Sequence, residues 1–217
     1  MIPYLQTTHY TCATSSLLAV LHYFDPNFEL SREKEFEIWK KTANLPTRAS
    51  SIFALANQAK LHGLNPVVVV ERIGYDFPDY RFYRYTKEDI DLASFTDQQY
   101  LKEAEQNKVV IEQKEITFKT VLAELQRHLL IIRLNTKPIR KEKKNTSNFI
   151  VIKGYSHGHF EIVDPRLGAL SIPEAFLREA FETLETKKYR DHRMIMFNLN
   201  DFPRHSPASD FKSCEYD

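Results

Sequence analysis

Apolar residues near the start of the chain recur at the spacing of a helix. They are mostly three or four residues apart, the period of one helix face, at Ala13, Leu17, Val20, Leu21 and Phe24. A short extended segment over residues 3–6 precedes them, and Cys12 lies between the two. Pro26 ends the helix, because the residue before a proline is disfavoured in the helical conformation. The pattern therefore predicts a buried helix whose first turn carries Cys12.

Two more helices are predicted in the N-terminal third of the chain. Ser31 suits the N-cap of a helix over residues 31–41. Either Ser50 or Ser51 caps a helix that runs to residue 62, and Gly63 ends it. Four consecutive valines follow, too branched and too few for a comfortable helix, so residues 66–70 are expected to form a strand.

The boundaries of the predicted elements are less clearly marked in the middle of the chain. We expect helices over residues 86–92, 96–107 and 118–128, and strands over 109–111 and 129–135. Residues 73–85 are rich in tyrosine and phenylalanine, which fits a long loop held on the core by aromatic side chains. Alternatively, this aromatic stretch forms one wall of a substrate groove. A basic run over residues 137–144 fits a solvated loop, or else a local patch for an acidic partner.

The last third of the chain has the pattern of a hairpin, a helix and a final strand. We expect strands over residues 149–153, 160–163 and 193–199, a turn over 154–158, and a helix over 171–183 with Pro173 at its start. Helices followed by mostly antiparallel strands predict an α+β fold in which the N-terminal helices pack on the sheet. We expect one domain over residues 1–200 and a polar C-terminal tail over 201–217.

The composition is that of an ordinary globular protein and narrows the choice of function. The 217 residues are 42% apolar and 27% charged with a net charge of +1, so nothing points to nucleic acid. The two cysteines, Cys12 and Cys214, lie at opposite ends, which fits a reduced, cytoplasmic setting better than a disulfide framework. We expect no signal peptide and no membrane span, and we find no nucleotide-binding motif. We expect no cofactor, and no metal site, because the close pair His157 and His159 lies in a turn without a nearby cysteine.

Cys12 has the position of a reactive thiol. The partial positive charge at a helix N-terminus favours the thiolate, so we expect the pKa of the Cys12 thiol to be lowered. Gln6 lies six residues upstream, where its amide N–H could point at an oxyanion that forms beside the sulfur. The alternative is a buried cysteine at the start of a helix that carries no chemistry.

Two segments resemble the papain-like cysteine peptidases that process double-glycine bacteriocin leaders, and more closely their stand-alone bacterial relatives. One is Gln6 followed by five residues and Cys12, and the other is FIVIKGYSHGHFEIVDP. The resemblance spans residues 2–199 and implies a papain-like fold. It also implies that Cys12 is the nucleophile, Gln6 the oxyanion donor and Asp164 the acid that orients the base. A guanylyl-cyclase-like family of plants and animals shares the pattern, so the match indicates the fold more strongly than the reaction.

The sequence departs from this family where the base should be. The family's catalytic histidine directly precedes the apolar strand, and here that residue is Asn148, which has no titratable proton near neutral pH. From the lengths of the predicted strands, three other histidines are expected about 15 Å or more from Asn148. They are His128, His157 and His159. His9 is close to Cys12 in sequence and is an alternative base, although the usual base lies across the cleft.

Two classes of function follow from these residues. In the first, the protein is a thiol-dependent hydrolase that acts on a peptide or amide bond, with Asn148 or His9 in an altered relay. In the second, the fold is kept, catalysis is lost, and the cleft binds a peptide or protein partner. Both predict a peptide or protein partner and neither predicts nucleic acid or membrane, while the oligomeric state stays open.

Overall fold

The computed structural model describes residues 1–74 and 85–201. The expectations about the aromatic stretch over residues 73–85 and the tail over 201–217 fall almost entirely outside these residues and stay predictions.

Seven helices lie in the described part of the chain. They are α1 (Cys12–Phe24), α2 (Arg32–Thr42), α3 (Ile52–Leu61), α4 (Lys87–Gln106), α5 (Phe118–Glu124), α6 (Lys137–Arg140) and α7 (Glu174–Lys188). Side-chain caps explain several starts, because they accept backbone N–H groups that the first turn leaves free. The Ser31 hydroxyl accepts from the Lys34 N–H at 3.3 Å, as its position in the sequence predicts. Thr86 and Asp89 form a reciprocal capping box at the start of α4.

The strands form one small and one large sheet. Strands β1 (Ala43–Asn44) and β2 (Ala49–Ser50) pair as a short antiparallel hairpin. The large sheet contains β3 (Val67–Val70), β4 (Val110–Gln113), β5 (His128–Asn135), β6 (Ser147–Ser156), β7 (His159–Asp164), β8 (Gly168–Pro173) and β9 (Arg193–Asn198). Its order is β4-β3-β9-β5-β6-β7-β8, and β3 with β4 is the one parallel pair of neighbours in it. The predicted α+β fold with a mostly antiparallel sheet is confirmed.

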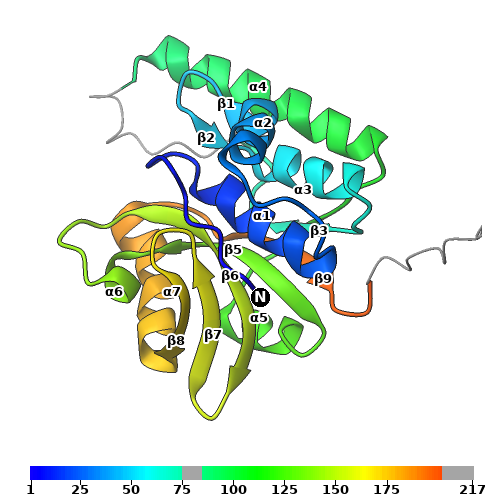
Figure 1. Ribbon diagram of the computed structural model, residues 1–217. Helices are drawn as coiled ribbons and strands as arrows, with labels where there is room; N and C mark the ends of the chain where they lie inside the picture. Colours follow the sequence, from blue (N-terminus) through cyan, green and yellow to red (C-terminus); the bar gives the residue numbers. More distant parts are fainter. Residues whose placement is uncertain (75–84, 202–217) are drawn as a thin grey trace, which may run out of the picture.

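The large sheet is covered on both faces, and its strands therefore supply two cores. Helices α1 and α3 pack on one face, while α5 and α7 pack on the other (Figure 1). Along β5, Leu129 and Ile131 belong to the first core, and Leu130 and Ile132 belong to the second. All four side chains are fully buried. Burial on both faces explains why the central strands are continuously apolar and do not alternate with polar residues.

The structure corrects three of the predicted elements. Residues 87–106 form one continuous helix, α4, in place of the two predicted helices, since no glycine or proline interrupts them. The turn predicted over residues 154–158 shrinks to His157 and Gly158, both at positive φ, and β6 runs on to Ser156. The helix predicted from residue 171 begins at Glu174, because residues 168–173 pair with β7 as the edge strand β8.

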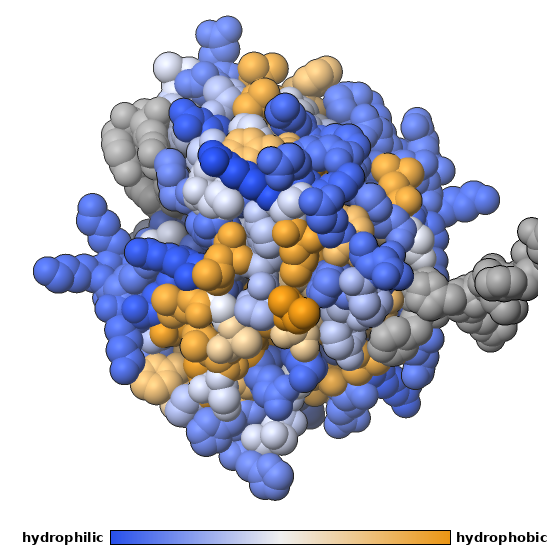
Figure 2. All heavy atoms as spheres, viewed as in Figure 1, coloured by the Kyte–Doolittle hydropathy of each residue, from blue (hydrophilic) through white to orange (hydrophobic). Residues whose placement is uncertain are grey.

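The N-terminal segment crosses from the helices to the sheet. The Gln6 N–H donates to the Pro165 carbonyl at 2.7 Å, just beyond β7. Pro3 and Leu5 lie against Gly168, at the start of β8. Hydrophobic side chains gather in the middle of the face on which this segment lies (Figure 2). None of the described helices combines the length and the apolar character that crossing a membrane requires.

Candidate functional site

Cys12 is positioned by the contact between α1 and β6. It is the first residue of α1, and it is only 9% exposed. One turn along the helix, the buried Ser16 hydroxyl donates to the Phe149 carbonyl of β6 at 3.1 Å. This bond fixes the start of α1 against the strand that follows Asn148, so two segments more than 130 residues apart meet at the thiol.

A narrow pocket of about 90 Å³ opens beside the thiol, and we call it the Cys12 pocket. Its lining includes Cys12, Asn148, Asn44, Ser51, Arg133 and Arg193. The structure thus brings together the predicted nucleophile and the residue at the predicted position of the base. Asn44 and Ser51 were not singled out by the sequence, since they approach Cys12 only through the short β1–β2 hairpin and the start of α3.

Asn148 and Asp164 are linked by an arginine. Arg140 Nε donates to Asp164 Oδ2 at 2.9 Å, and both side chains are almost fully buried. With the Asn148 amide oriented to satisfy its neighbours, Arg140 Nη1 donates to the Asn148 oxygen at 2.8 Å, and the Asn148 nitrogen donates to the Ser147 carbonyl at 3.1 Å. A guanidinium therefore bridges the two positions where a papain-type site has its imidazole and its orienting acid.

Both carboxylate oxygens of Asp164 are already hydrogen-bonded, so an imidazole would have to compete with Arg140 for Oδ2. Its Oδ1 accepts from the backbone N–H groups of Arg166 and Leu167, at 2.8 and 3.0 Å, while Oδ2 holds Arg140. The reading of the basic run as a solvated loop is thus wrong for Arg140, although Lys141 and Lys144 are exposed. Arg140 is the one arginine among the lysines of this run, but the local sequence does not show which acid it contacts. Its burial follows from the short helix α6, which turns its side chain toward β7.

The surroundings of Cys12 raise the pKa of its thiol, whereas the sequence led us to expect a lowered pKa. Burial raises the pKa of the Cys12 thiol, because a thiolate loses hydration in the interior. Backbone hydrogen bonds from Phe149 and Ala13 and the charge of Arg140 lower the pKa, but they only partly offset burial. The expected lowering by the helix N-terminus is therefore wrong, since desolvation outweighs it.

Gln6 lies apart from the lining of the Cys12 pocket. Its Nε2 donates to the Thr8 carbonyl at 2.7 Å, so one amide hydrogen is already used. The neighbouring residue Thr7 is held by the buried Glu35 of α2, which accepts from the Thr7 backbone N–H at 2.9 Å and from its hydroxyl at 2.6 Å. The role of Gln6 as an oxyanion donor stays a prediction.

The alternative histidines lie away from the thiol. His9 is exposed, and its ring packs edge-on against Tyr10 outside the Cys12 pocket. In the β5–β6 register Leu134 is opposite Asn148, which places His128 six residues further along β5, about 20 Å away. His157 and His159 are at the hairpin turn beyond the far end of β6. No described histidine lines the Cys12 pocket.

Two polar atoms in the Cys12 pocket lack partners. Asn44 donates through Nδ2 to Asp97 at 3.0 Å, but its Oδ1 is buried with no hydrogen-bond partner among the described residues. The buried Ser51 hydroxyl likewise has no hydrogen-bond partner among the described residues. On the opposite side, Arg133 and Arg193 both contact Asp191. The charged side chains that line the pocket are therefore more often basic than acidic.

Comparisons with known proteins concern the family and the fold of the chain. The family model described as Peptidase C39-like family matches residues 2–180. Among solved structures, the chain is similar to a double-glycine-motif protease from an AMS/PCAT transporter, crystallised in complex with the leader peptide. That similarity has 18% sequence identity and a TM-score of 0.47, and it covers 91% of this chain and 92% of the protease chain. The comparison with curated proteins gives no significant match.

Proposed function

The chain belongs to the Peptidase C39-like family, and we propose that its Cys12 pocket binds a peptide without cleaving it by a papain-type mechanism. One observation carries this proposal: the pocket contains buried polar atoms without a hydrogen-bond partner, and no described histidine lines it.

The argument against cleavage starts from the proton of the thiol. A papain-type reaction needs a group that takes this proton and returns it to the leaving amine. Asn148 can do neither, because its amide does not titrate near neutral pH. Arg140 cannot replace it, since a guanidinium stays protonated and offers no acceptor. The raised pKa of Cys12 further lowers the fraction of thiolate at neutral pH.

The argument for binding starts from the unpartnered atoms. Buried polar groups in native proteins are nearly always hydrogen-bonded, because an unmade bond costs about 1–3 kcal/mol. Asn44 Oδ1 and Ser51 Oγ therefore favour a ligand that completes them. An extended peptide offers backbone N–H donors and carbonyl acceptors for such atoms. The volume of about 90 Å³ admits a small side chain or a short run of backbone.

The charges of the pocket favour an acidic segment. Three arginines and one aspartate line it. Asp191 partly neutralises two of these arginines, and the lining itself has more basic than acidic side chains. We therefore propose a peptide with small residues next to a carboxylate.

Selection from a random phage-displayed peptide library on the wild-type protein tests this proposal. Affinities of the selected peptides are measured by fluorescence anisotropy, and mass spectrometry of the same mixtures reports cleavage. Ser51→Ala is expected to weaken binding about two- to tenfold, the value of one hydrogen bond, while leaving the fold intact because the hydroxyl has no partner in the free protein.

The matched control is Ser171→Ala, on the edge strand β8, where the side chain is exposed. It is expected to leave every affinity unchanged. Enrichment of no peptide, or equal loss with both serine variants, would contradict binding at the Cys12 pocket.

A second candidate function is a thiol-dependent hydrolase with an altered relay. It is favoured by the backbone hydrogen bonds from Phe149 and Ala13 and by the nearby charge of Arg140, all of which stabilise a thiolate at Cys12. Under this alternative, the selected peptides are cut by the wild type and remain intact with Cys12→Ala.

A further inference from the structure

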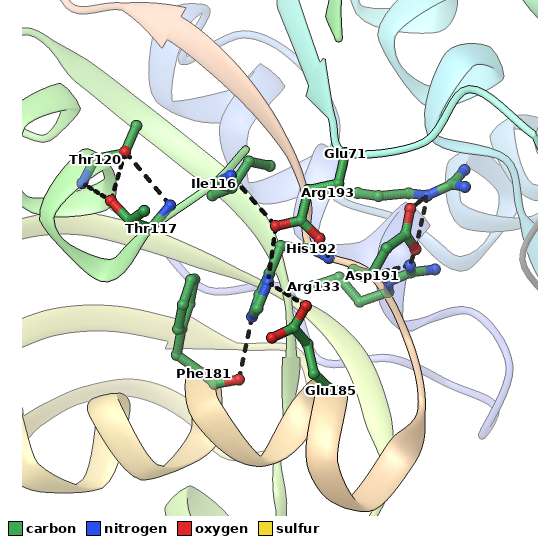
Figure 3. A network of polar contacts seen from close by, with 10 residues as sticks. All are labelled: Glu71, Ile116, Thr117, Thr120, Arg133, Phe181, Glu185, Asp191, His192 and Arg193. Carbon is green, nitrogen blue, oxygen red and sulfur yellow. Dashed lines mark hydrogen bonds and ion pairs between the residues drawn. The ribbon is translucent and has the colours of Figure 1, made fainter. Parts of the chain in front are cut away.

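Two carboxylates and one imidazole meet on the side of the sheet that α5 and α7 cover. Glu71 follows β3, His192 precedes β9, and Glu185 lies in the last turns of α7 (Figure 3). One ligand atom from each of the three residues lies within 4.8 Å of the other two. The residues are separated by up to 121 positions in sequence and come together because β3 pairs with β9. No sequence motif identifies these three residues as a group.

His192 has its proton placed by the fold. The ring is 98% buried, and it stacks on Phe181 with centroids 3.7 Å apart. Its Nε2 lies 3.2 Å from the Phe181 carbonyl, which can only accept, so Nε2 carries the hydrogen. A metal-bound histidine usually donates its second ring N–H to a carbonyl or carboxylate in this way.

The other ring nitrogen then faces acceptors only. Nδ1 is 3.3 Å from Glu71 Oε1 and 3.9 Å from Glu185 Oε1. In a neutral imidazole with its hydrogen on Nε2, Nδ1 presents a lone pair to both carboxylates. Three electron-pair donors that converge in this way need a cation between them. The cation is either a second proton on His192 or a metal ion.

The surroundings favour a divalent ion. The three residues line a depression of about 550 Å³ whose other charged side chains include Glu115 and Glu182. Four carboxylates thus face one basic side chain, Arg72. A single proton would neutralise little of this charge.

We propose that Glu71, Glu185 and His192 bind a divalent transition-metal ion such as Zn²⁺. One imidazole nitrogen and two carboxylate oxygens are ligands that zinc accepts. Bonds of about 2.0–2.1 Å at tetrahedral angles put neighbouring ligand atoms about 3.4 Å apart. The 3.3 Å pair already matches this spacing, and the exposed Glu185 side chain needs only a small rotation to shorten the 3.9 Å pair.

The remaining bonds of Glu71 hold it in place for this role. Its Oε2 accepts from the His192 backbone N–H at 2.7 Å, and its Oε1 accepts from the Ile116 N–H at 3.2 Å. The fourth coordination position would face the depression and be open to water. The site would tie the end of α7 to β3 and β9, and it does not depend on the function proposed for the Cys12 pocket.

Isothermal titration of the metal-free protein with Zn²⁺ tests the proposal. It is done in a His157→Gln/His159→Gln background, which removes the exposed histidine pair of the hairpin. One saturable site is expected. Glu185→Gln should weaken binding at least about tenfold, as expected when a ligand is lost. This substitution is at an exposed position, so the fold should tolerate it.

Glu179→Gln is the matched control, since Glu179 is exposed on the same helix but outside the depression. It should bind Zn²⁺ like the parent protein. Anomalous scattering from a zinc-soaked crystal should place the ion against His192 Nδ1. Absence of a stoichiometric site, or equal affinity in the two glutamate variants, would overturn the proposal.

Discussion

At the scale of single residues, three side chains decide what the thiol can do. Asn148 stands at the position predicted for the base, Arg140 contacts both Asn148 and Asp164, and both contacts are buried. Charge-assisted hydrogen bonds of this kind are stronger than neutral ones. The hydrogen bonds among Asn148, Arg140 and Asp164 therefore form a stable network in place of a catalytic relay. The position where a histidine is missing is not empty.

The acidity of Cys12 is directly measurable from its alkylation by iodoacetamide as a function of pH. Because burial raises the pKa of the thiol, the midpoint in the folded protein is expected above the free value of about 8.5. The raised folded-state pKa also means that stability falls as the pH rises above the unfolded-state value. A Cys214→Ser background isolates the signal, and the same protein in urea supplies the reference midpoint. A folded midpoint below that reference would contradict the prediction.

Restoring the family histidine should expose the effect of Arg140. Asn148→His places an imidazole near Cys12, but Asp164 is already engaged by Arg140. We therefore expect a small rise in the alkylation rate at pH 7 for the single variant. The double variant Asn148→His/Arg140→Gln should give at least about a tenfold rise, because the imidazole can then bond Asp164 and pair with the thiol.

Circular dichroism of both variants controls for folding, since Arg140 is buried. Equal rates in the single and double variants would show that Arg140 does not compete for Asp164.

At the scale of elements, α4 depends on its first turn. Thr86 Oγ1 accepts from the Asp89 N–H at 3.1 Å, and Asp89 Oδ2 accepts from the Thr86 N–H at 2.8 Å. Thr86→Ala is expected to lower the free energy of unfolding by about 1 kcal/mol, measured by urea denaturation. Thr96→Ala in the middle of the same helix is the control. It should be neutral or slightly stabilising, because its hydroxyl only bonds the Leu92 carbonyl one turn back.

The predictable elements are those with local signals. Pro26, Ser31 and the four valines each act within a few residues, and the helices and strand that they predict are present. Strand β8 has no such signal, because its sequence includes Pro173 and only its pairing with β7 makes it a strand. The same limit applies to the site. Cys12, Asn148 and Asp164 are visible from motif spacing, whereas Arg140 depends on a tertiary contact across 24 residues.

At the scale of the whole molecule, the buried Glu35 joins three segments. It accepts hydrogen bonds from Tyr4 and Thr7 of the N-terminal segment and from Ser15 of α1, while it belongs to α2. The N-terminal segment continues to the Pro165 carbonyl of the sheet. The carboxylate therefore stabilises the contact between the helical layer and the sheet.

Glu35→Ala should destabilise the protein by more than about 2 kcal/mol, because several donors, including the buried Ser15 hydroxyl, lose a charged acceptor together. Urea denaturation at neutral pH measures the change. Glu33→Ala in the same helix is the control, since this exposed side chain acts only on the helix dipole and should cost less than about 1 kcal/mol. A similar loss in the two variants would show that the Glu35 network contributes little.

The contacts of Arg140 with Asn148 and Asp164 affect which substitutions this sequence can accept during evolution. Replacing Arg140 alone leaves the buried Asp164 without its cation, and breaking a buried pair costs about 3–5 kcal/mol. Replacing Asn148 alone by histidine gives an imidazole whose natural acceptor is occupied. The step that removes Arg140 first is thus unfavourable, whereas an imidazole already present at residue 148 could bond the Asp164 that is released. Random substitution without selection would therefore tend to retain Asn148 and Arg140.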